Sequence, residues 1–193
     1  MFKRLRIAVL LYVLLFVAAA QYLTARRSTD WDSALWVDVY TVDGDGRPAT
    51  RDYLARFDPD EFRAVERFFA AEARRHGVTL EQPFKVRFID EFRSQLPAIG
   101  RAPSVLEVLS WSLHMRWLAA RLQWQSREPS GDIVVFAVYH EASDNLSLDN
   151  STALEKGQIA VANLFADRSA RGSNAMVLAH ELLHTLGATD KYE

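Results

Sequence analysis

The sequence of 193 residues contains no cysteine. This absence excludes disulfide bonds and thiolate metal sites, so a metal ion can bind only through histidine, aspartate or glutamate. The chain also has no internal repeat and no low-complexity segment. Hydrophobic residues make up 49% of the sequence and charged residues 25%, which is the balance of a globular protein rather than a disordered one.

A basic surface pattern of the kind that binds nucleic acid is also missing. Residues 1–27 contain five basic residues and no acidic one. Subtracting these five from the 23 Lys and Arg residues leaves 18 against 25 Asp and Glu residues, so residues 28–193 carry a net charge of −7. An acidic body without a basic stripe argues against a nucleic-acid partner.

The N-terminus has the pattern of a membrane signal. Residues 7–25 contain no charged side chain, and a helix of this length comes close to spanning a hydrocarbon core of ~30 Å. Three basic residues precede the run and two follow it, so the positive-inside rule keeps the N-terminus in the cytoplasm. We therefore expect residues 1–27 to be one transmembrane helix that anchors an exported domain, residues 28–193, to the membrane.

A cleaved signal peptide is the alternative interpretation of residues 1–27. Ala18 and Ala20 form an A-x-A cleavage pattern, and the apolar run before them has the length of a signal-peptide core. Tyr22 and Leu23 prolong the apolar run, which favours the uncleaved anchor. With cleavage at Ala20 the domain would be secreted, and with either signal it would lie outside the cytoplasm.

Residues 28–193 are expected to form an α+β domain, a mixed β-sheet with packed helices. Apolar alternation and β-branched residues predict strands over residues 35–42, 84–90, 132–140 and 158–166. Capping residues and apolar periodicity predict helices over 58–76, 105–125 and 173–186. The segment 141–157 is predicted to be a polar loop. Asp43 and Asp45 follow the first strand in a turn, and a calcium loop is disfavoured because Leu54 stands where its glutamate would be.

Two apolar stripes run along the helix predicted over residues 105–125. One stripe consists of Leu106, Leu109, Leu113, Trp117, Ala120 and Trp124. The other consists of Val108, Trp111, Met115, Leu118 and Leu122. Two stripes predict burial on more than one side, so we expect this helix to be the central packing element. The alternative is that its tryptophans line a ligand groove.

The sequence HELLHTLGATD, residues 180–190, contains a candidate zinc site. His180 and His184 lie four residues apart and project from one face of the last predicted helix, where two imidazole nitrogens can hold one zinc ion at about 2.0–2.1 Å. Glu181 follows about 100° further around the helix axis and can reach a water molecule at the metal. Gly187 permits a left-handed turn after the helix, so that Asp190 can return as third ligand.

These residues suit peptide-bond hydrolysis. Zinc lowers the pKa of a water ligand towards about 7 and polarises a carbonyl group. Glu181 would accept the proton of that water and pass it to the leaving amine as general base. His140, at the end of the strand predicted over 132–140, could approach the site, although a structural role is the favoured interpretation.

The motif HELLHTLGATD resembles the zinc-peptidase signature HExxHxxGxxH/D of the metzincins, in its Asp-ended variant. The resemblance implies a metzincin-like zincin catalytic domain that binds Zn²⁺ through His180, His184 and Asp190, with Glu181 as base. It also implies that an edge strand before the active-site helix aligns an extended peptide or protein substrate, and residues 158–166 stand in the right place for that role.

One feature of the metzincins has no counterpart in the sequence. Their Met-turn lies downstream of the third ligand, whereas here nothing follows Glu193. Either the chain belongs to a longer protein or the lower wall of the cleft is absent. We therefore expect a zinc-dependent endopeptidase acting on exported proteins, with two alternatives. One is an exported zinc-binding domain without activity, and the other is a non-enzymatic, membrane-anchored binding module that uses grooves beside Trp111, Trp117 and Trp124.

Overall fold

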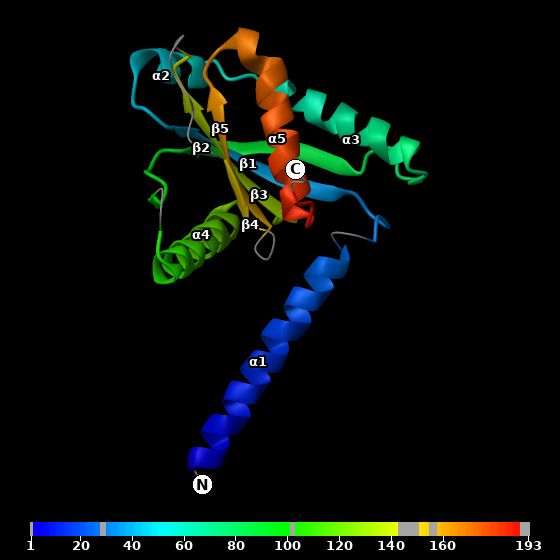
Figure 1. Cartoon of the computed structure of the whole chain (residues 1–193), viewed down its shortest axis with the longest axis vertical. Coiled ribbons are helices and arrows are strands. Elements are labelled where there is room, and N and C mark those ends of the chain that lie inside the picture. The colour runs from blue at the N-terminus through cyan, green and yellow to red at the C-terminus, as the bar shows by residue number, and fades with distance from the viewer. Residues whose placement is uncertain (1, 28–29, 101–102, 143–150, 155–157, 190–193) are drawn as a thin grey trace.

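The computed structural model of the chain describes residues 2–27, 30–100, 103–142, 151–154 and 158–189. Helix α1 (Phe2–Arg27) projects from the body of the molecule, and the body is built on a five-stranded sheet (Figure 1). The strands are β1 (Leu35–Asp43), β2 (Phe84–Phe92), β3 (Ile133–His140), β4 (Thr152–Leu154) and β5 (Ile159–Phe165). Their order is β2-β1-β3-β5-β4, in which only the β4–β5 pair is antiparallel. The expected α+β domain with a mixed sheet is confirmed.

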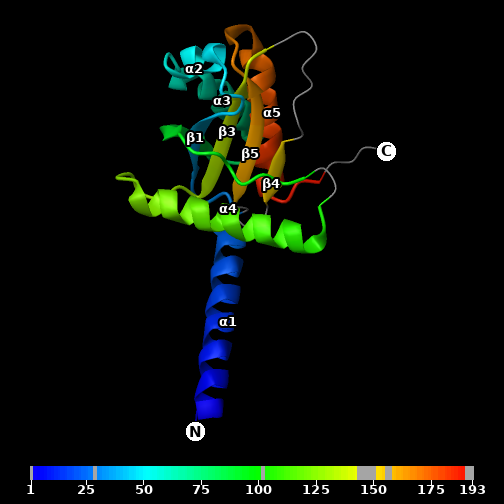
Figure 2. The same cartoon turned by 90° about the vertical axis from the view of Figure 1, so that its left-hand side faces the viewer.

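Both faces of the sheet are apolar and both are covered. Side chains of β3 alternate between two clusters, with Val135 and Ala137 on one face and Val134 and Phe136 on the other. Helices α3 (Arg63–Arg75) and α5 (Arg171–Thr185) pack on the first face, with the shorter α2 (Pro48–Leu54). Helix α4 (Val105–Gln125) covers the second face (Figure 2). Short 3₁₀ turns at Pro59–Phe62 and Arg168–Ala170 lead into α3 and α5.

Two elements were not predicted from the sequence. Helix α2 begins at Pro48, and its seven residues are too few to show an apolar period. Strand β4 lies in the segment predicted to be a polar loop, and its three residues are held by antiparallel pairing with β5. The prediction that residues 158–166 form an edge strand is wrong, because β5 lies between β3 and β4. On the side of β5 the edge strand is β4, and the other edge strand is β2.

The prediction that α4 is buried on more than one side is also wrong. Trp111, Met115 and Ala119 are buried against the sheet, but the stripe that contains Trp117 and Trp124 faces solvent. The two stripes lie on different sides of the helix, and only one side can meet a single sheet. No second layer covers α4 within the described residues.

The Asp43–Asp45 turn is confirmed as a structural turn. Asp43 accepts a hydrogen bond from the backbone N–H of Gly46 at 2.7 Å, and Asp45 accepts from the N–H of Arg47 at 3.0 Å and of Glu141 at 2.7 Å. The first two bonds are within the turn, and the bond from Glu141 joins the turn after β1 to the end of β3. Burial raises the pKa of Asp45, but the backbone hydrogen bonds and the Thr50 hydroxyl outweigh it, so the pKa is lowered.

Across the described part of the chain, no helix combines the length and the apolar character needed to cross a membrane.

We predict that Asp45→Asn lowers the free energy of unfolding at neutral pH by about 1 kcal/mol, because it weakens the two backbone bonds. The lowered pKa of Asp45 means that its carboxylate contributes stability above its unfolded pKa and loses this contribution as the pH falls through the folded value. Urea unfolding should therefore show a difference between parent and variant near neutral pH that disappears in acid. Asp52→Asn, on the exposed side of α2, is the control and should behave like the parent.

Candidate metal site

Helix α5 is fixed on the sheet by both apolar and polar contacts. Leu178 and Leu182 are buried in the core below the helix. The side chain of Asn174 donates to the carbonyl of Phe165 at 2.9 Å and accepts from its N–H at 3.0 Å, which ties the helix to the end of β5. Arg171 pairs with Glu61 at 3.1 Å. These contacts leave the helix little freedom to rotate, so the side of α5 that carries the histidines is set by the core.

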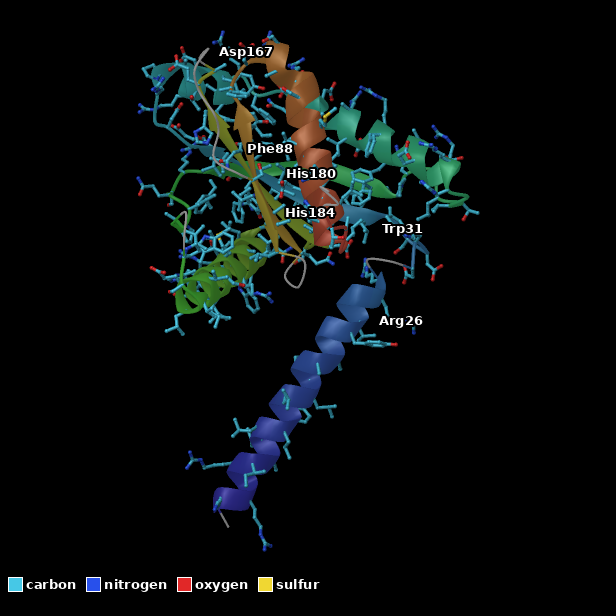
Figure 3. All side chains as sticks on the ribbon, in the orientation of Figure 1. Arg26, Trp31, Phe88, Asp167, His180 and His184 are labelled. Atoms are coloured by element: carbon cyan, nitrogen blue, oxygen red, sulfur yellow. The ribbon has the colours of Figure 1, made fainter. Side chains whose placement is uncertain are left out.

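His180 and His184 meet on this helix as the sequence predicts (Figure 3). Their Nε2 atoms are 2.9 Å apart, and the two rings are perpendicular with centroids 4.4 Å apart. Both side chains are half-buried. Two nitrogens bound to one zinc ion at a tetrahedral angle would be about 3.3 Å apart. The observed separation is therefore within a small side-chain movement of a shared metal ion.

The turn that ends α5 sets the orientation of His184. Gly187 has φ +90°, in the left-handed region, and Ala188 N–H bonds to the carbonyl of Leu183 at 3.1 Å. This is a Schellman closure of the helix. It brings the carbonyl of Ala188 to 2.8 Å from Nδ1 of His184. Because the carbonyl can only accept, Nδ1 of His184 carries a proton, and in the neutral ring Nε2 is then the nitrogen with the lone pair.

Glu181 lies on the sheet-facing side of α5 and only 4% of its surface is exposed. It is the residue after His180, so its side chain leaves the helix about 100° around the axis from that ligand candidate. The side chain is therefore buried in the body of the molecule rather than exposed to solvent. Burial shields the carboxylate from bulk water.

The predicted third ligand, Asp190, lies outside the described residues. Among the residues that the structure describes, no group of three or more His, Asp or Glu side chains is arranged to hold a metal ion. What the structure provides is a two-histidine half-site and the left-handed turn at Gly187 that was expected to redirect the chain. The carbonyl of Ala188, which contacts His184, is a part of the site that was not predicted from the sequence. The one sequence feature that indicates it is Gly187, which ends the helix.

His140 does not contribute to this site. It ends β3 on the face of the sheet that α4 covers, whereas α5 lies on the opposite face. Its Nε2 lies 3.1 Å from Oδ1 of Asn163 on β5. A methyl group added at Gly44 would lie 2.5 Å from the imidazole, so the ring is packed closely against the β1 turn. The favoured structural role of His140 agrees with these contacts.

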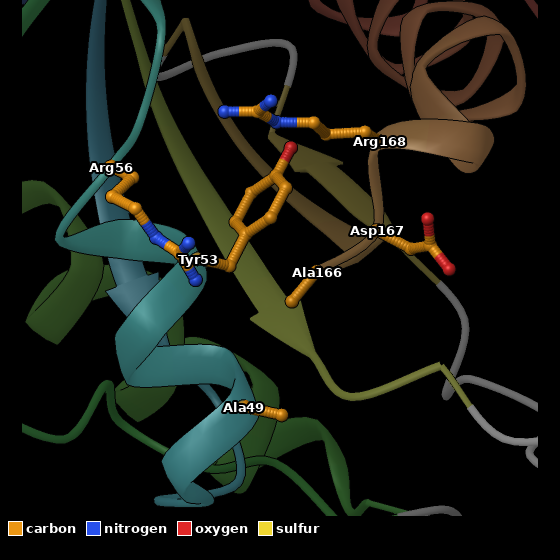
Figure 4. Close-up of a pocket in the computed structure, with 6 residues that line it drawn as sticks. All are labelled: Ala49, Tyr53, Arg56, Ala166, Asp167 and Arg168. Carbon is orange, nitrogen blue, oxygen red and sulfur yellow. The ribbon is translucent and has the colours of Figure 1, made fainter.

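A separate pocket lies at the other end of α5, between α2 and the connection from β5 to α5 (Figure 4). Its lining residues are Ala49, Tyr53, Arg56, Ala166, Asp167 and Arg168. Burial and the Glu61 carboxylate, which accepts from the Tyr53 hydroxyl at 2.6 Å, raise the pKa of Tyr53. The pocket contains none of the residues predicted to bind metal, and the hydroxyl of Tyr53 is already hydrogen-bonded to Glu61.

No protein-family model, curated protein or solved structure matches the chain. The features of the chain that indicate a function are therefore the histidine pair, the helix-end turn and the burial of Glu181.

We predict that Gly187→Ala lowers zinc affinity by about tenfold to a hundredfold, because an L-residue is strained at φ +90° and the turn positions the carbonyl that orients His184. Isothermal titration with zinc measures the effect. Gly172→Ala is the matched control, since it lies in the same helix and an added methyl group meets no atom within 4 Å. An unchanged zinc affinity in Gly187→Ala would show that the turn does not orient the ligand.

Proposed function

We propose that the chain is a zinc-dependent endopeptidase with a metzincin-like catalytic domain. The observation that carries the proposal is the convergence of the Nε2 atoms of His180 and His184, with Nδ1 of His184 held by the Ala188 carbonyl. Histidines that bind zinc usually donate their other ring N–H to a carbonyl or carboxylate group, as His184 does to Ala188. Asp190 is the proposed third ligand and Glu181 the proposed general base.

The donor set fits zinc. Two imidazole nitrogens and one carboxylate oxygen match the ligands that zinc accepts, and three protein ligands leave a position for water. When bound, zinc polarises a carbonyl group and makes water more acidic. Glu181 accepts the proton of the attacking water and delivers it to the leaving amine, and its burial keeps bulk water from competing for that proton.

The proposed substrate is an extended peptide segment. Strand β4 lies at one edge of the sheet, opposite the β2 edge, and among the described strands it pairs with β5 alone. Helix α5 contacts both of these strands. An extended chain that added to β4 by strand pairing would lie along the edge of the sheet nearest α5. The metzincin resemblance implies that an edge strand pairs with the substrate. We assign this role to β4 instead of residues 158–166.

The proposed location is outside the cytoplasm, and its support is the N-terminal sequence. Residues 7–25 are uncharged, and the basic residues before them favour a cytoplasmic N-terminus. An anchor and a signal peptide cleaved after Ala20 both deliver residues 28–193 across the membrane. The substrates on this proposal are exported peptides or proteins.

Zinc content tests the proposed site. The purified full-length chain, without a histidine tag, should hold about one zinc ion by elemental mass spectrometry. His184→Ala should lose most of the metal, with an affinity lower by more than about a hundredfold, because a ligand has been removed. His114→Ala, which removes an exposed histidine from α4, is the matched control and should keep the metal. Absence of zinc from the parent after metal is added back would contradict the proposal.

Turnover tests the role of Glu181. Glu181→Gln preserves the shape of the side chain but cannot accept a proton, so peptide hydrolysis should fall by about 10²–10⁴-fold while bound zinc stays near the parent value. Hydrolysis of a fluorogenic peptide, measured with and without a chelator, gives the readout. Full zinc occupancy without hydrolysis in the parent would favour the inactive zinc-binding domain. If the parent chain binds no zinc and does not respond to chelator, the binding module would be favoured.

A further inference from the structure

Helix α4 exposes a continuous apolar stripe to solvent. Leu106 is 77% exposed, Leu113 67%, Trp117 59% and Trp124 91%. Leu109 lies between them and is also exposed. These residues recur at spacings of three, four and seven, so they share one side of the helix. A stripe of this size on a folded protein marks a contact surface.

The stripe cannot be buried by rotation of the helix. On the opposite side, Trp111 and Met115 are buried in the core, and the indole N–H of Trp111 donates to the carbonyl of Pro97 at 2.8 Å. Ser104 and Glu107 form a capping box that fixes the first turn. The side chain of Gln123 donates to the carbonyl of Gly131 at 3.0 Å and fixes the last turn. The helix is therefore held with its apolar stripe outward.

The charged residues that directly flank the stripe are basic. Arg116 and Arg121 flank it on either side, and the guanidinium of Arg121 lies 5.4 Å from the centroid of the Trp117 ring. Glu107 is the only acidic residue of α4, and its carboxylate is engaged by Ser104 in the capping box. Leucine and tryptophan bordered by arginine are typical of a helix that lies at a lipid interface, where the rings sit at headgroup level and the guanidinium groups reach phosphate.

The stripe also lies at the end of the body where α1 projects. Arg27, the last residue of α1, pairs with Asp132 at 3.0 Å, and the neighbouring Gly131 accepts the hydrogen bond from Gln123 of α4. Figures 1 and 2 show α4 across the base of the body, on the side from which α1 extends. Helix α1 exposes apolar side chains of its own, among them Leu10, Leu15 and Phe16.

We propose that α4 is a membrane-docking helix that lies flat in the headgroup region of a lipid bilayer, with its Leu–Trp stripe towards the acyl chains. The occupant of this surface is a lipid bilayer, because the apolar stripe of α4 and the exposed apolar side chains of α1 occur at one end of the body (Figure 2). This surface goes beyond the zinc site, which lies on α5 on the other face of the sheet. The docking fixes the orientation of the catalytic domain on the membrane.

Site-directed spin labelling tests the proposal on the full-length chain. The sequence contains no cysteine, so Leu113→Cys and Trp117→Cys each introduce a single labelling site on an exposed side chain without disturbing the core. His114→Cys, on the next side of the same helix, and Ser173→Cys, on α5, are the matched controls. The chain is reconstituted with vesicles of phosphatidylcholine and anionic phosphatidylglycerol, and power saturation compares the accessibility of each label to oxygen and to a water-soluble nickel complex.

The Leu113 and Trp117 labels should show a several-fold rise in the ratio of oxygen to nickel accessibility on vesicles, because oxygen concentrates in the bilayer and the complex is excluded. The His114 label should shift less and the Ser173 label should stay in water. Stripe labels that remain as accessible to nickel as Ser173 on vesicle-bound chain would overturn the proposal. Dipolar broadening of the Leu113 label that disappears on dilution with unlabelled chain would assign the stripe to a second copy instead. None of these outcomes depends on zinc.

Discussion

The two-sided apolar character of the central strands sets the architecture of the body. β1, β3 and β5 are parallel and buried, and β3 sends apolar side chains to both faces of the sheet. A sheet of this kind must be covered on both faces. Helix α5 covers one face and α4 covers the other, and each helix has one side that points away from the sheet. The histidine pair lies on that side of α5, and the Leu–Trp stripe lies on that side of α4.

The geometry of the histidine pair depends on the end of α5 as much as on the spacing of the motif. Two histidines four residues apart share a helix face in any helix, but which nitrogen carries the lone pair is set by what the other nitrogen bonds. Here the Schellman turn at Gly187 supplies the Ala188 carbonyl to His184. The glycine in the motif therefore has two physical roles, since it ends the helix and completes the orientation of a ligand candidate.

The sequence predicted the elements whose signals are local. The predicted bounds of α4 agree with the structure because a capping box marks its start, and the predicted strands differ from β1, β2, β3 and β5 by at most two residues at either end. Strand β4 was not predicted, because it is stabilised by pairing with β5 and its three residues are too few to show a strand pattern. The exposure of Trp117 and Trp124 also escaped, since an apolar stripe in a sequence does not reveal whether protein, lipid or solvent lies opposite it.

The separation of the two surfaces bears on how the proposed enzyme would meet its substrates. A bilayer against α4 would lie on one side of the sheet, and the histidine pair on α5 would lie on the other, with the thickness of the sheet between them. An extended segment added to the β4 edge would then approach from the aqueous phase rather than from the lipid. On this arrangement, docking by α4 does not deliver a membrane-embedded substrate. It would hold the body at a fixed orientation, so that chains extending from the membrane surface would reach the β4 edge and the proposed metal site together.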